Sequence, residues 1–382
     1  MEPDLKNRIK ETAFAFRGYN ITNTGRSAEL LAADPYRGTL ERFLGEAGGI
    51  CQDVLKRDCD LISQVGGERE TTLETFAEDI AIILAVEIAQ ITILREQFGV
   101  DYAKSPLTFG YSLGEIAALC CSGVYTLADV LPSLLELAPG CAELGRDVTM
   151  GIVFSRGHEL EFAKVSQLCQ EINWEARGVI GVSAVLSPNT VLILGQGDTV
   201  DRFDARMREA FPKTVHLRKN DSRWPPLHTP ILWQIHLPAQ AQHRMLSIRG
   251  GMTEPKPTIF SLATGGANYT STNSREIIAQ WLDHPQQLWE AVYATLAAGH
   301  EVIVHVGPQP NLVPATFRRL SDNVEAQLKG RSWNSLSLRA VSSIWRPWLS
   351  RWISKKSALL RAPYVIHVNL EDWLLENQPK AG

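Results

Sequence analysis

The stretch that decides the fold is Phe109 to Leu119, FGYSLGEIAAL. A serine stands between two glycines, after the short apolar run SPLTFGYS and before the helical pattern GEIAALCCSG. Glycines at these two places allow a tight strand-to-helix turn that exposes the serine hydroxyl, and the backbone N–H groups that follow point toward a developing oxyanion. The pattern therefore predicts a nucleophile elbow at Ser112, although such a short Gly-Ser motif also occurs as an ordinary turn.

A serine hydroxyl needs a base, and histidine is the usual one near neutral pH. Among the nine histidines, His228 lies in the proline-stiffened loop RWPPLHTPIL, whereas His216 and His305 lie in strand-like runs, where a structural role is expected. We therefore predict that His228 activates Ser112. No acidic residue between the two stands out as a third triad member, which disfavours an ordinary α/β-hydrolase esterase.

The composition is that of a globular protein with a sizeable core. The chain has 382 residues, 45% of them hydrophobic, and a formal net charge of −4, which fits one large domain or two modest ones. Its most apolar run, Ile80 to Leu94, contains Glu87 and Gln90 and is shorter than the roughly 20 residues of a membrane span. Because the N-terminal MEPDLKNRIKETAF is charged where a signal peptide is apolar, we expect a cytoplasmic location.

Cysteine and histidine spacing gives no sign of a metal site. The six cysteines form no C-x-x-C pair and no pattern with histidine that suits zinc. We therefore predict buried reduced thiols, with neither a metal nor a disulfide framework.

The order of patterns along the chain predicts an α/β fold with an insertion. The strand-like runs VTMGIVF, GVIGVSAVL, TVLILGQG and KTVHL enclose two helical patterns in a β-α-β-β-α-β order, the ferredoxin-like arrangement. The α/β pattern resumes after His228 with the strand-like PTIFSLATG and EVIVHVGP. We predict an α/β-hydrolase-like large domain in two parts, at residues 1–146 and 218–322. A ferredoxin-like small domain lies between these parts at residues 147–217, and a C-terminal extension follows at residues 323–382.

The extension is basic and rich in tryptophan. Between Arg331 and Arg361 there is no acidic residue, and the segment carries Trp333, Trp345, Trp348 and Trp352. The last three have helical spacing. Two interpretations stay open: a basic amphipathic helix that contacts a membrane surface or an acidic partner, or, the one we favour, a tail packed onto its own domain.

Several features together resemble one family, the acyl-CoA:acyl-carrier-protein acyltransferases, which include malonyl transacylases and the acyltransferase domains of polyketide synthases. The family's Gly-His-Ser-x-Gly-Glu is matched by GYSLGE around Ser112, and its His-Ser-Pro by HTP at His228. Looser matches are FAFRGYN to Phe-x-Phe-Pro-Gly-Gln-Gly, LSPNTVLILG to Asn-Ser-Pro and HVGPQPNL to Val-Gly-Pro. The matches keep the family's order from about residue 13 to 320, with the ferredoxin-like insertion at the expected place.

The resemblance implies that Ser112 is the nucleophile and His228 the general base. It also implies that a backbone carbonyl in the loop DHPQQLW, at Gln287, holds the histidine. The oxyanion hole would be the backbone N–H groups of Leu113 and of Tyr19, which replaces the family's glutamine. In a ping-pong reaction an acyl-CoA would acylate Ser112 and the phosphopantetheine thiol of an acyl carrier protein would accept the acyl group. No bound cofactor, metal or nucleic acid is expected.

The expected acyl pocket departs from the family. Malonyl-type members pair the free carboxylate of the acyl group with an arginine, and that position aligns here with Ala138 or a neighbouring residue. An unpaired carboxylate in a closed pocket is costly, so malonyl is disfavoured unless Arg146 or Arg17 reaches in. The other pocket positions that differ from the family are Tyr111, Asp79 and Leu227.

Three functions stay open. We favour an acyltransferase that moves a monocarboxylic acyl group from CoA to a carrier protein in fatty-acid or polyketide-type biosynthesis. The second is an acyl hydrolase of the same fold, in which water rather than a thiol resolves the acyl-enzyme. The third is a non-catalytic relative that docks partners.

Overall fold

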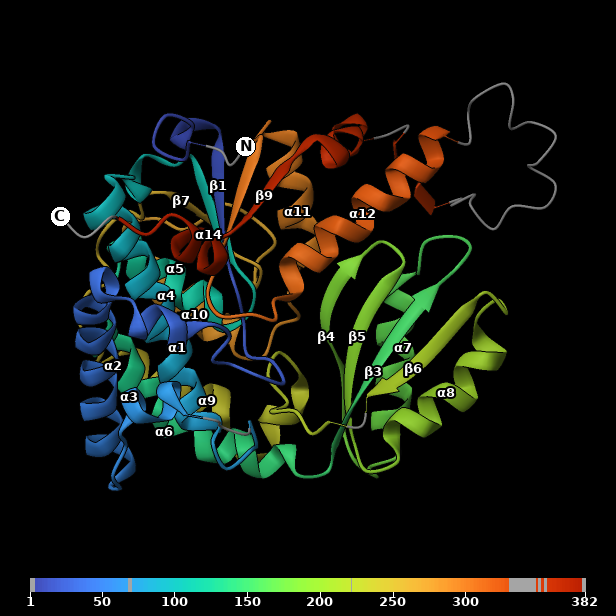
Figure 1. Cartoon of the computed structure of the whole chain (residues 1–382). Coiled ribbons are helices and arrows are strands. Elements are labelled where there is room, and N and C mark those ends of the chain that lie inside the picture. Colours follow the sequence, from blue (N-terminus) through green and yellow to red (C-terminus); the bar gives the residue numbers. More distant parts are fainter. Residues whose placement is uncertain are drawn as a thin grey trace.

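The structure is a computed structural model that describes residues 4–67, 71–220, 222–329, 348–349, 352–353 and 356–379. Two sheets organise it (Figure 1). The first has five strands in the order β7-β2-β1-β8-β9, and the second has four in the order β4-β5-β3-β6. The predicted α/β fold with a separate small domain is confirmed.

The large sheet is parallel throughout. Its central strand β1 is buried at every residue. Because side chains alternate along a strand, Phe14 and Phe16 enter one core and Ala13 and Ala15 enter the other. The strands are β1 (Thr12–Phe16), β2 (Leu107–Gly110), β7 (Thr258–Phe260), β8 (Val302–Val306) and β9 (Ile366–Asn369).

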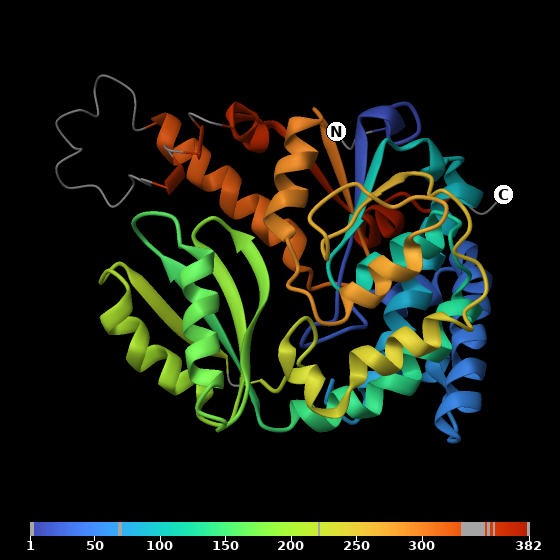
Figure 2. The same cartoon turned by 180° about the vertical axis from the view of Figure 1, so that it is seen from behind.

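Helices cover both faces of this sheet (Figures 1 and 2), as a parallel sheet requires. The core on the Phe14 side holds residues of α1 (Ser27–Ala32), α2 (Asp34–Leu55), α3 (Leu61–Gly66), α4 (Phe76–Phe98), α5 (Leu113–Cys121), α6 (Leu127–Gly145), α9 (Leu237–Met245), α10 (Ser274–Trp281) and α14 (Leu370–Glu376). The opposite core holds residues of α11 (Leu288–Ala297) and α12 (Leu312–Lys329). Short 3-10 turns lie at Ile9–Glu11, Tyr102–Lys104, Pro230–Ile235 and Ser357–Tyr364.

The small domain has the predicted β-α-β-β-α-β order, and its sheet is antiparallel. Its elements are β3 (Val148–Ser155), α7 (Phe162–Asn173), β4 (Ile180–Ser187), β5 (Thr190–Gln196), α8 (Thr199–Ala210) and β6 (Val215–Asn220). Helices α7 and α8 pack on one face, with Leu168 and Phe203 in a core of their own. The other face is turned toward the large domain (Figure 1).

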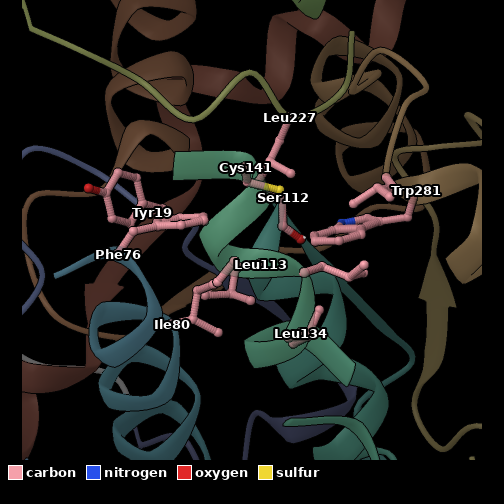
Figure 3. A pocket seen from close by; sticks show the side chains of 12 residues that line it. Tyr19, Phe76, Ile80, Ser112, Leu113, Leu134, Cys141, Leu227 and Trp281 are labelled. Carbon is pink, nitrogen blue, oxygen red and sulfur yellow. Dashed lines mark hydrogen bonds between the residues drawn. The ribbon is translucent and has the colours of Figure 1, made fainter. Parts of the chain in front are cut away.

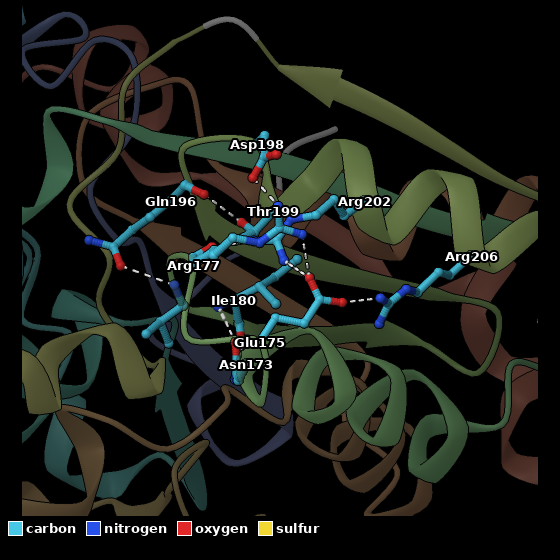
Figure 4. Close-up of polar contacts among 10 residues, drawn as sticks. Asn173, Glu175, Arg177, Ile180, Gln196, Asp198, Thr199, Arg202 and Arg206 are labelled. Atoms are coloured by element: carbon cyan, nitrogen blue, oxygen red, sulfur yellow. Dashed lines mark hydrogen bonds and ion pairs between the residues drawn. The ribbon is translucent and has the colours of Figure 1, made fainter.

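A polar network ties the end of α7 to the next strand and to α8 (Figure 4). The Asn173 side chain bonds both the N–H and the carbonyl of Ile180, at 2.8 and 2.9 Å. The Glu175 carboxylate contacts Arg177, Arg202 and Arg206, and these bonds lower its pKa to about 2. The network joins α7, β4 and α8 within the small domain.

The described part of the C-terminal extension packs onto the protein itself. Strand β9 pairs with β8 at the edge of the large sheet. Trp348 and Leu349 are buried beside α11 and α12, and Trp352 Nε1 donates to Glu159 of the small domain at 2.7 Å. The packing interpretation is therefore confirmed for these residues, whereas Trp333 and Trp345 lie outside the described residues. In the described ranges, no helix has both the length and the apolar character to cross a membrane.

Candidate active site

Ser112 occupies a turn that its two neighbouring glycines make possible. It follows β2, precedes α5, and has φ 53° and ψ −119°, a backbone conformation that is rare for a residue with a side chain. A Cβ on Gly110 would lie 2.0 Å from the backbone carbon of Gly114, and a Cβ on Gly114 would lie 2.4 Å from the Arg17 carbonyl oxygen. Only glycine fits on both sides, so the sequence fixes the sharp turn that presents the serine hydroxyl.

The turn places Ser112 against His228. Ser112 Oγ lies 2.7 Å from His228 Nε2, and His228 Nδ1 lies 2.7 Å from the Trp281 carbonyl oxygen. A carbonyl only accepts hydrogen bonds, so Nδ1 carries the proton and Nε2 accepts the serine O–H. Burial lowers the pKa of His228 to about 4, against an opposing effect of the Trp281 carbonyl. The histidine is therefore neutral at pH 7 and able to act as a base.

The carbonyl that orients the histidine belongs to Trp281, and the prediction of Gln287 is wrong. Gln287 precedes α11, and its N–H donates to the Leu262 carbonyl at 2.8 Å. Trp281 is the last residue of α10, and no N–H group within a helix donates to the carbonyls of its last turn. The carbonyl is thus available because α10 ends beside His228.

Sequence reasoning also missed two side chains that hold the nucleophile turn. Trp281 Nε1 donates to the Ser112 carbonyl at 2.8 Å, and its ring meets the His228 ring edge-on with centroids 5.3 Å apart. The buried Gln286 side chain accepts the Ser112 N–H at 3.1 Å. Gln286 lies in the predicted loop DHPQQLW, one residue before Gln287, whereas Trp281 lies outside that loop, two residues before Asp283.

The two predicted oxyanion donors lie beside the nucleophile. Leu113 is the first residue of α5, where a backbone N–H has no acceptor within the helix. Tyr19 and Leu113 line one pocket together with Ser112 (Figure 3). The Ser112 N–H already donates to Gln286. The backbone N–H of Leu113 is therefore the expected oxyanion donor at the start of α5. Their role as an oxyanion hole stays a prediction.

A small apolar pocket opens beside the Ser112 hydroxyl (Figure 3). Its other lining residues are Tyr19, Phe76, Ile80, Leu113, Leu134, Leu137, Ala138, Cys141, Leu227, Trp281 and Leu282. None of these described lining residues carries a charge. We call this space the acyl pocket; the predicted pocket residues Ala138 and Leu227 do line it.

Two predicted pocket residues lie elsewhere. Tyr111 lines a second pocket on the other side of Ser112, because its ring packs toward the core that contains α11 and α12. Asp79 lines neither of the two pockets. It is buried in the first turn of α4 and accepts the Thr75 hydroxyl at 2.9 Å, since adjacent residues of a helix, here Asp79 and Ile80, point in different directions.

Neither arginine that was considered as a carboxylate partner reaches the acyl pocket. Arg17 is fully buried, with Nε on the Gly18 carbonyl at 2.7 Å and Nη2 on Asn23 Oδ1 at 2.6 Å. The Arg146 side chain is 70% exposed and pairs with Glu143 at 3.0 Å. The described residues therefore offer no cation to a carboxylate bound there.

The second pocket is a wide cleft between the small sheet and α12. The small sheet contributes Met150, Ile152, Leu186, Leu192 and Leu194, and α12 contributes Leu312, Thr316 and Arg319. Tyr19, Ser112 and Leu227 line both pockets. The serine therefore stands where a small apolar space meets a wide cleft.

Within the described residues, no group of three or more histidine, cysteine, aspartate or glutamate side chains is arranged to hold a metal ion.

Comparison with known proteins gives consistent results. No family model matches the chain. A malonyl CoA-acyl carrier protein transacylase of Salmonella typhimurium is 26% identical over 320 residues, which cover 83% of this chain and 95% of the relative. The crystal structure of FabD from Acinetobacter baumannii aligns with a TM-score of 0.62 and 17% identity, over 81% of this chain and 91% of that one. A malonyl-transacylase solved in complex with a type II polyketide synthase acyl carrier protein aligns with a TM-score of 0.60 and 19% identity, over 80% and 92%.

These matches confirm the resemblance that the motifs predicted. The relatives are acyltransferases, which is the enzyme class predicted for this chain. The solved structures share its fold over most of their length.

Proposed function

We propose that this chain, a relative of the malonyl-CoA:acyl-carrier-protein transacylases, is a serine acyltransferase that moves a monocarboxylic acyl group from CoA to the phosphopantetheine thiol of an acyl carrier protein. The observation that carries the proposal is the pair of 2.7 Å contacts from Ser112 to His228 and from His228 to the Trp281 carbonyl, beside a pocket whose described lining is uncharged.

The first half-reaction acylates the serine. His228 Nε2 takes the Ser112 hydroxyl proton as Oγ attacks the thioester carbonyl carbon. The Trp281 carbonyl stabilises the imidazolium through Nδ1–H, and the N–H groups of Leu113 and Tyr19 stabilise the oxyanion. Collapse of the tetrahedral intermediate breaks the carbon–sulfur bond, and the leaving CoA sulfur takes the proton from Nε2.

The second half-reaction reverses these roles. A phosphopantetheine thiol in the wide cleft gives its proton to His228 Nε2 and attacks the acyl-serine carbonyl. Breaking the ester bond returns the proton to Ser112 Oγ and leaves the acyl group on the carrier protein. The relative solved with a carrier protein supports this choice of acceptor. An acyl hydrolase shares the first half-reaction and uses water in the second.

Intact-mass measurement with a panel of acyl-CoAs tests the proposal. We expect an adduct of the acyl mass on Ser112, passage of the acyl group to a holo acyl carrier protein, and no adduct with Ser112→Ala. Loss of the adduct to water at the same rate with or without the carrier protein would instead identify a hydrolase. No adduct with any donor would identify a docking protein and end both enzymatic proposals.

Donor choice tests the acyl class. Because the described lining of the acyl pocket has no cation, a free carboxylate would be desolvated there without a partner. We expect malonyl-CoA to acylate Ser112 more slowly than acetyl-CoA. The reverse order would mean that a cation outside this lining pairs with the carboxylate.

A further inference from the structure

Gln286 is a point at which the small domain meets the nucleophile. Its main chain runs beside β4, the edge strand of the small sheet. The Gln286 N–H donates to the Ser183 carbonyl, and the Gln286 carbonyl accepts the Val185 N–H, both at 2.9 Å. These two bonds pair Gln286 with Ala184 in the manner of an added parallel strand, so the placement of β4 fixes that of the Gln286 main chain.

The side chain of Gln286 reaches from this pairing to the Ser112 turn. It is fully buried, and its Oε1 accepts the Ser112 N–H at 3.1 Å. Since only the oxygen of an amide accepts an N–H, this bond fixes the orientation of the amide and turns Nε2 toward His228 Nδ1, 3.3 Å away. Nδ1 donates to the Trp281 carbonyl, so Nε2 packs against the imidazole without a hydrogen bond. One buried amide therefore contacts both Ser112 and His228.

The Ser112 backbone needs such a partner. Its φ of 53° and ψ of −119° lie in a sparsely populated region, which persists only where the surroundings hold it. Because Ser112 is buried, its N–H must find an acceptor within the protein. Gln286 supplies that acceptor, and the Trp281 indole N–H donates to the carbonyl of the same serine. Two side chains thus hold the two backbone polar groups of the nucleophile.

We infer that Gln286 is a positioning residue, whose side-chain oxygen sets the place of Ser112 Oγ relative to His228 Nε2. Gln286 lines neither the acyl pocket nor the wide cleft, so it acts through Ser112 and not through the substrate. The inference rests on the proposed function for the choice of donor, and it adds a residue on which the rate depends. A displacement of about 1 Å between reacting groups slows a reaction by about 10²-fold.

Single-turnover acylation of Ser112 over a range of acetyl-CoA concentrations, followed by intact mass, measures the effect. Gln286→Met keeps the length of the side chain and removes the oxygen acceptor, so it should lower the maximal acylation rate by about 10- to 100-fold. The half-saturating concentration of acetyl-CoA should change less than about twofold, because contacts with the donor are untouched. All of the protein should still become labelled at long times.

Gln287→Met is the matched control, because the Gln287 side chain, one residue along, makes no capping hydrogen bond to α11. It should change the rate less than about twofold. Gln286→Asn keeps the amide on a shorter arm and should also slow acylation, which serves the test if Gln286→Met does not fold. An unchanged rate in the folded Gln286 variants, an equal loss in Gln287→Met, or a smaller labelled fraction at an unchanged rate constant would overturn the positioning role.

A fluorophosphonate probe separates this inference from the proposed function. Its phosphorus forms a bond to Ser112 Oγ as fluoride and the hydroxyl proton leave, so it reports activation of the serine without an acyl donor. If the probe labels the unmodified chain and no acyl-CoA does, the proposed function fails. A slower probe reaction in Gln286→Met than in Gln287→Met then still supports the positioning role, and equal probe rates overturn it. If neither the probe nor any acyl-CoA labels the unmodified chain, both proposals fail.

Discussion

Two buried polar clusters lie at the carboxyl ends of the neighbouring strands β1 and β2, and they differ in charge and in open space. The serine cluster consists of Ser112, His228 and the Trp281 carbonyl; its groups are neutral and it opens onto two pockets. The arginine cluster consists of Arg17, Glu87 and the oxygen acceptors around the guanidinium; the side chains of Arg17 and Glu87 line neither of these pockets.

The difference lies in what surrounds each group, because Arg17 is held by protein oxygens and lines neither pocket at Ser112. The Arg17 guanidinium bonds the Gly18 carbonyl and Asn23 Oδ1, and its backbone N–H donates to Glu87. Burial lowers the pKa of Arg17 to about 10 and raises that of Glu87, and each charge opposes the shift of the other. This cluster holds the loop that carries Tyr19 through Gly18 and Asn23, while the described side chains that line the pocket beside Ser112 are uncharged.

The largest effect is expected from removing the base of the serine cluster. His228 has φ 65°, which asparagine tolerates, so His228→Asn removes the base with little backbone strain. Loss of general-base catalysis should slow Ser112 acylation by about 10²–10⁴-fold in single-turnover measurements. His216→Asn, in β6 of the small domain, serves as the control and should change the rate less than about twofold. Equal losses in the two variants would refute the role of His228.

We expect a substitution in the arginine cluster to change the free energy of unfolding. Arg17→Met leaves buried carbonyls and the Glu87 carboxylate without their cation, and should lower the free energy of unfolding by about 3 kcal/mol or more in a urea titration. Arg146→Met removes only an exposed pair with Glu143 and should cost less than about 1 kcal/mol. If Arg17→Met instead left stability unchanged and altered the malonyl-to-acetyl preference, Arg17 would be a substrate anchor after all.

The sequence predicted the parts of this site that depend on local sterics and element order. The Ser112 turn follows from Gly110 and Gly114, because any side chain at those glycines would overlap backbone atoms. The small domain follows from the alternation of strand-like and helical runs, since that order has few compact solutions. Both are readable in one sequence because each depends on residues close together in the chain.

The parts that were missed depend on where elements stop and how they pack. The Trp281 carbonyl reaches His228 only because α10 ends at that residue, and helix ends are the least certain feature of any sequence-based prediction. Asp79 and Tyr111 were assigned to the pocket by resemblance to the family, but side-chain direction decides which space they line. The pairing of β9 with β8 joins distant segments, and no local pattern specifies it.

A cation placed in the acyl pocket should give the neutral serine cluster a charged neighbour, as the arginine cluster has. Ala138→Arg puts a guanidinium among the lining residues of the Ser112 pocket, where a charged hydrogen bond to a carboxylate should shift the malonyl-to-acetyl preference by about 10-fold or more. Ala138→Met is the control for bulk without charge, and competition between the two donors is read from adduct masses. A similar shift in both variants would attribute the preference to pocket size rather than to charge.

The smallest expected effect is the pH response of the serine cluster. With an ordinary histidine pKa of about 6.5, the neutral fraction rises about fourfold from pH 6 to pH 8. Burial lowers the pKa of His228 to about 4, so the base is already neutral at pH 6, and the acylation rate should change less than about 1.2-fold over that range. Protonation of Nε2 removes the base, so the rate should fall only as pH drops toward 4.

The measurement is single-turnover acylation of Ser112, because this step does not involve the titratable thiol of the second half-reaction. A fourfold loss of rate between pH 8 and pH 6 would mean that His228 titrates as an exposed histidine does. Burial would then not keep the serine cluster neutral, and the difference in charge from the arginine cluster would be lost.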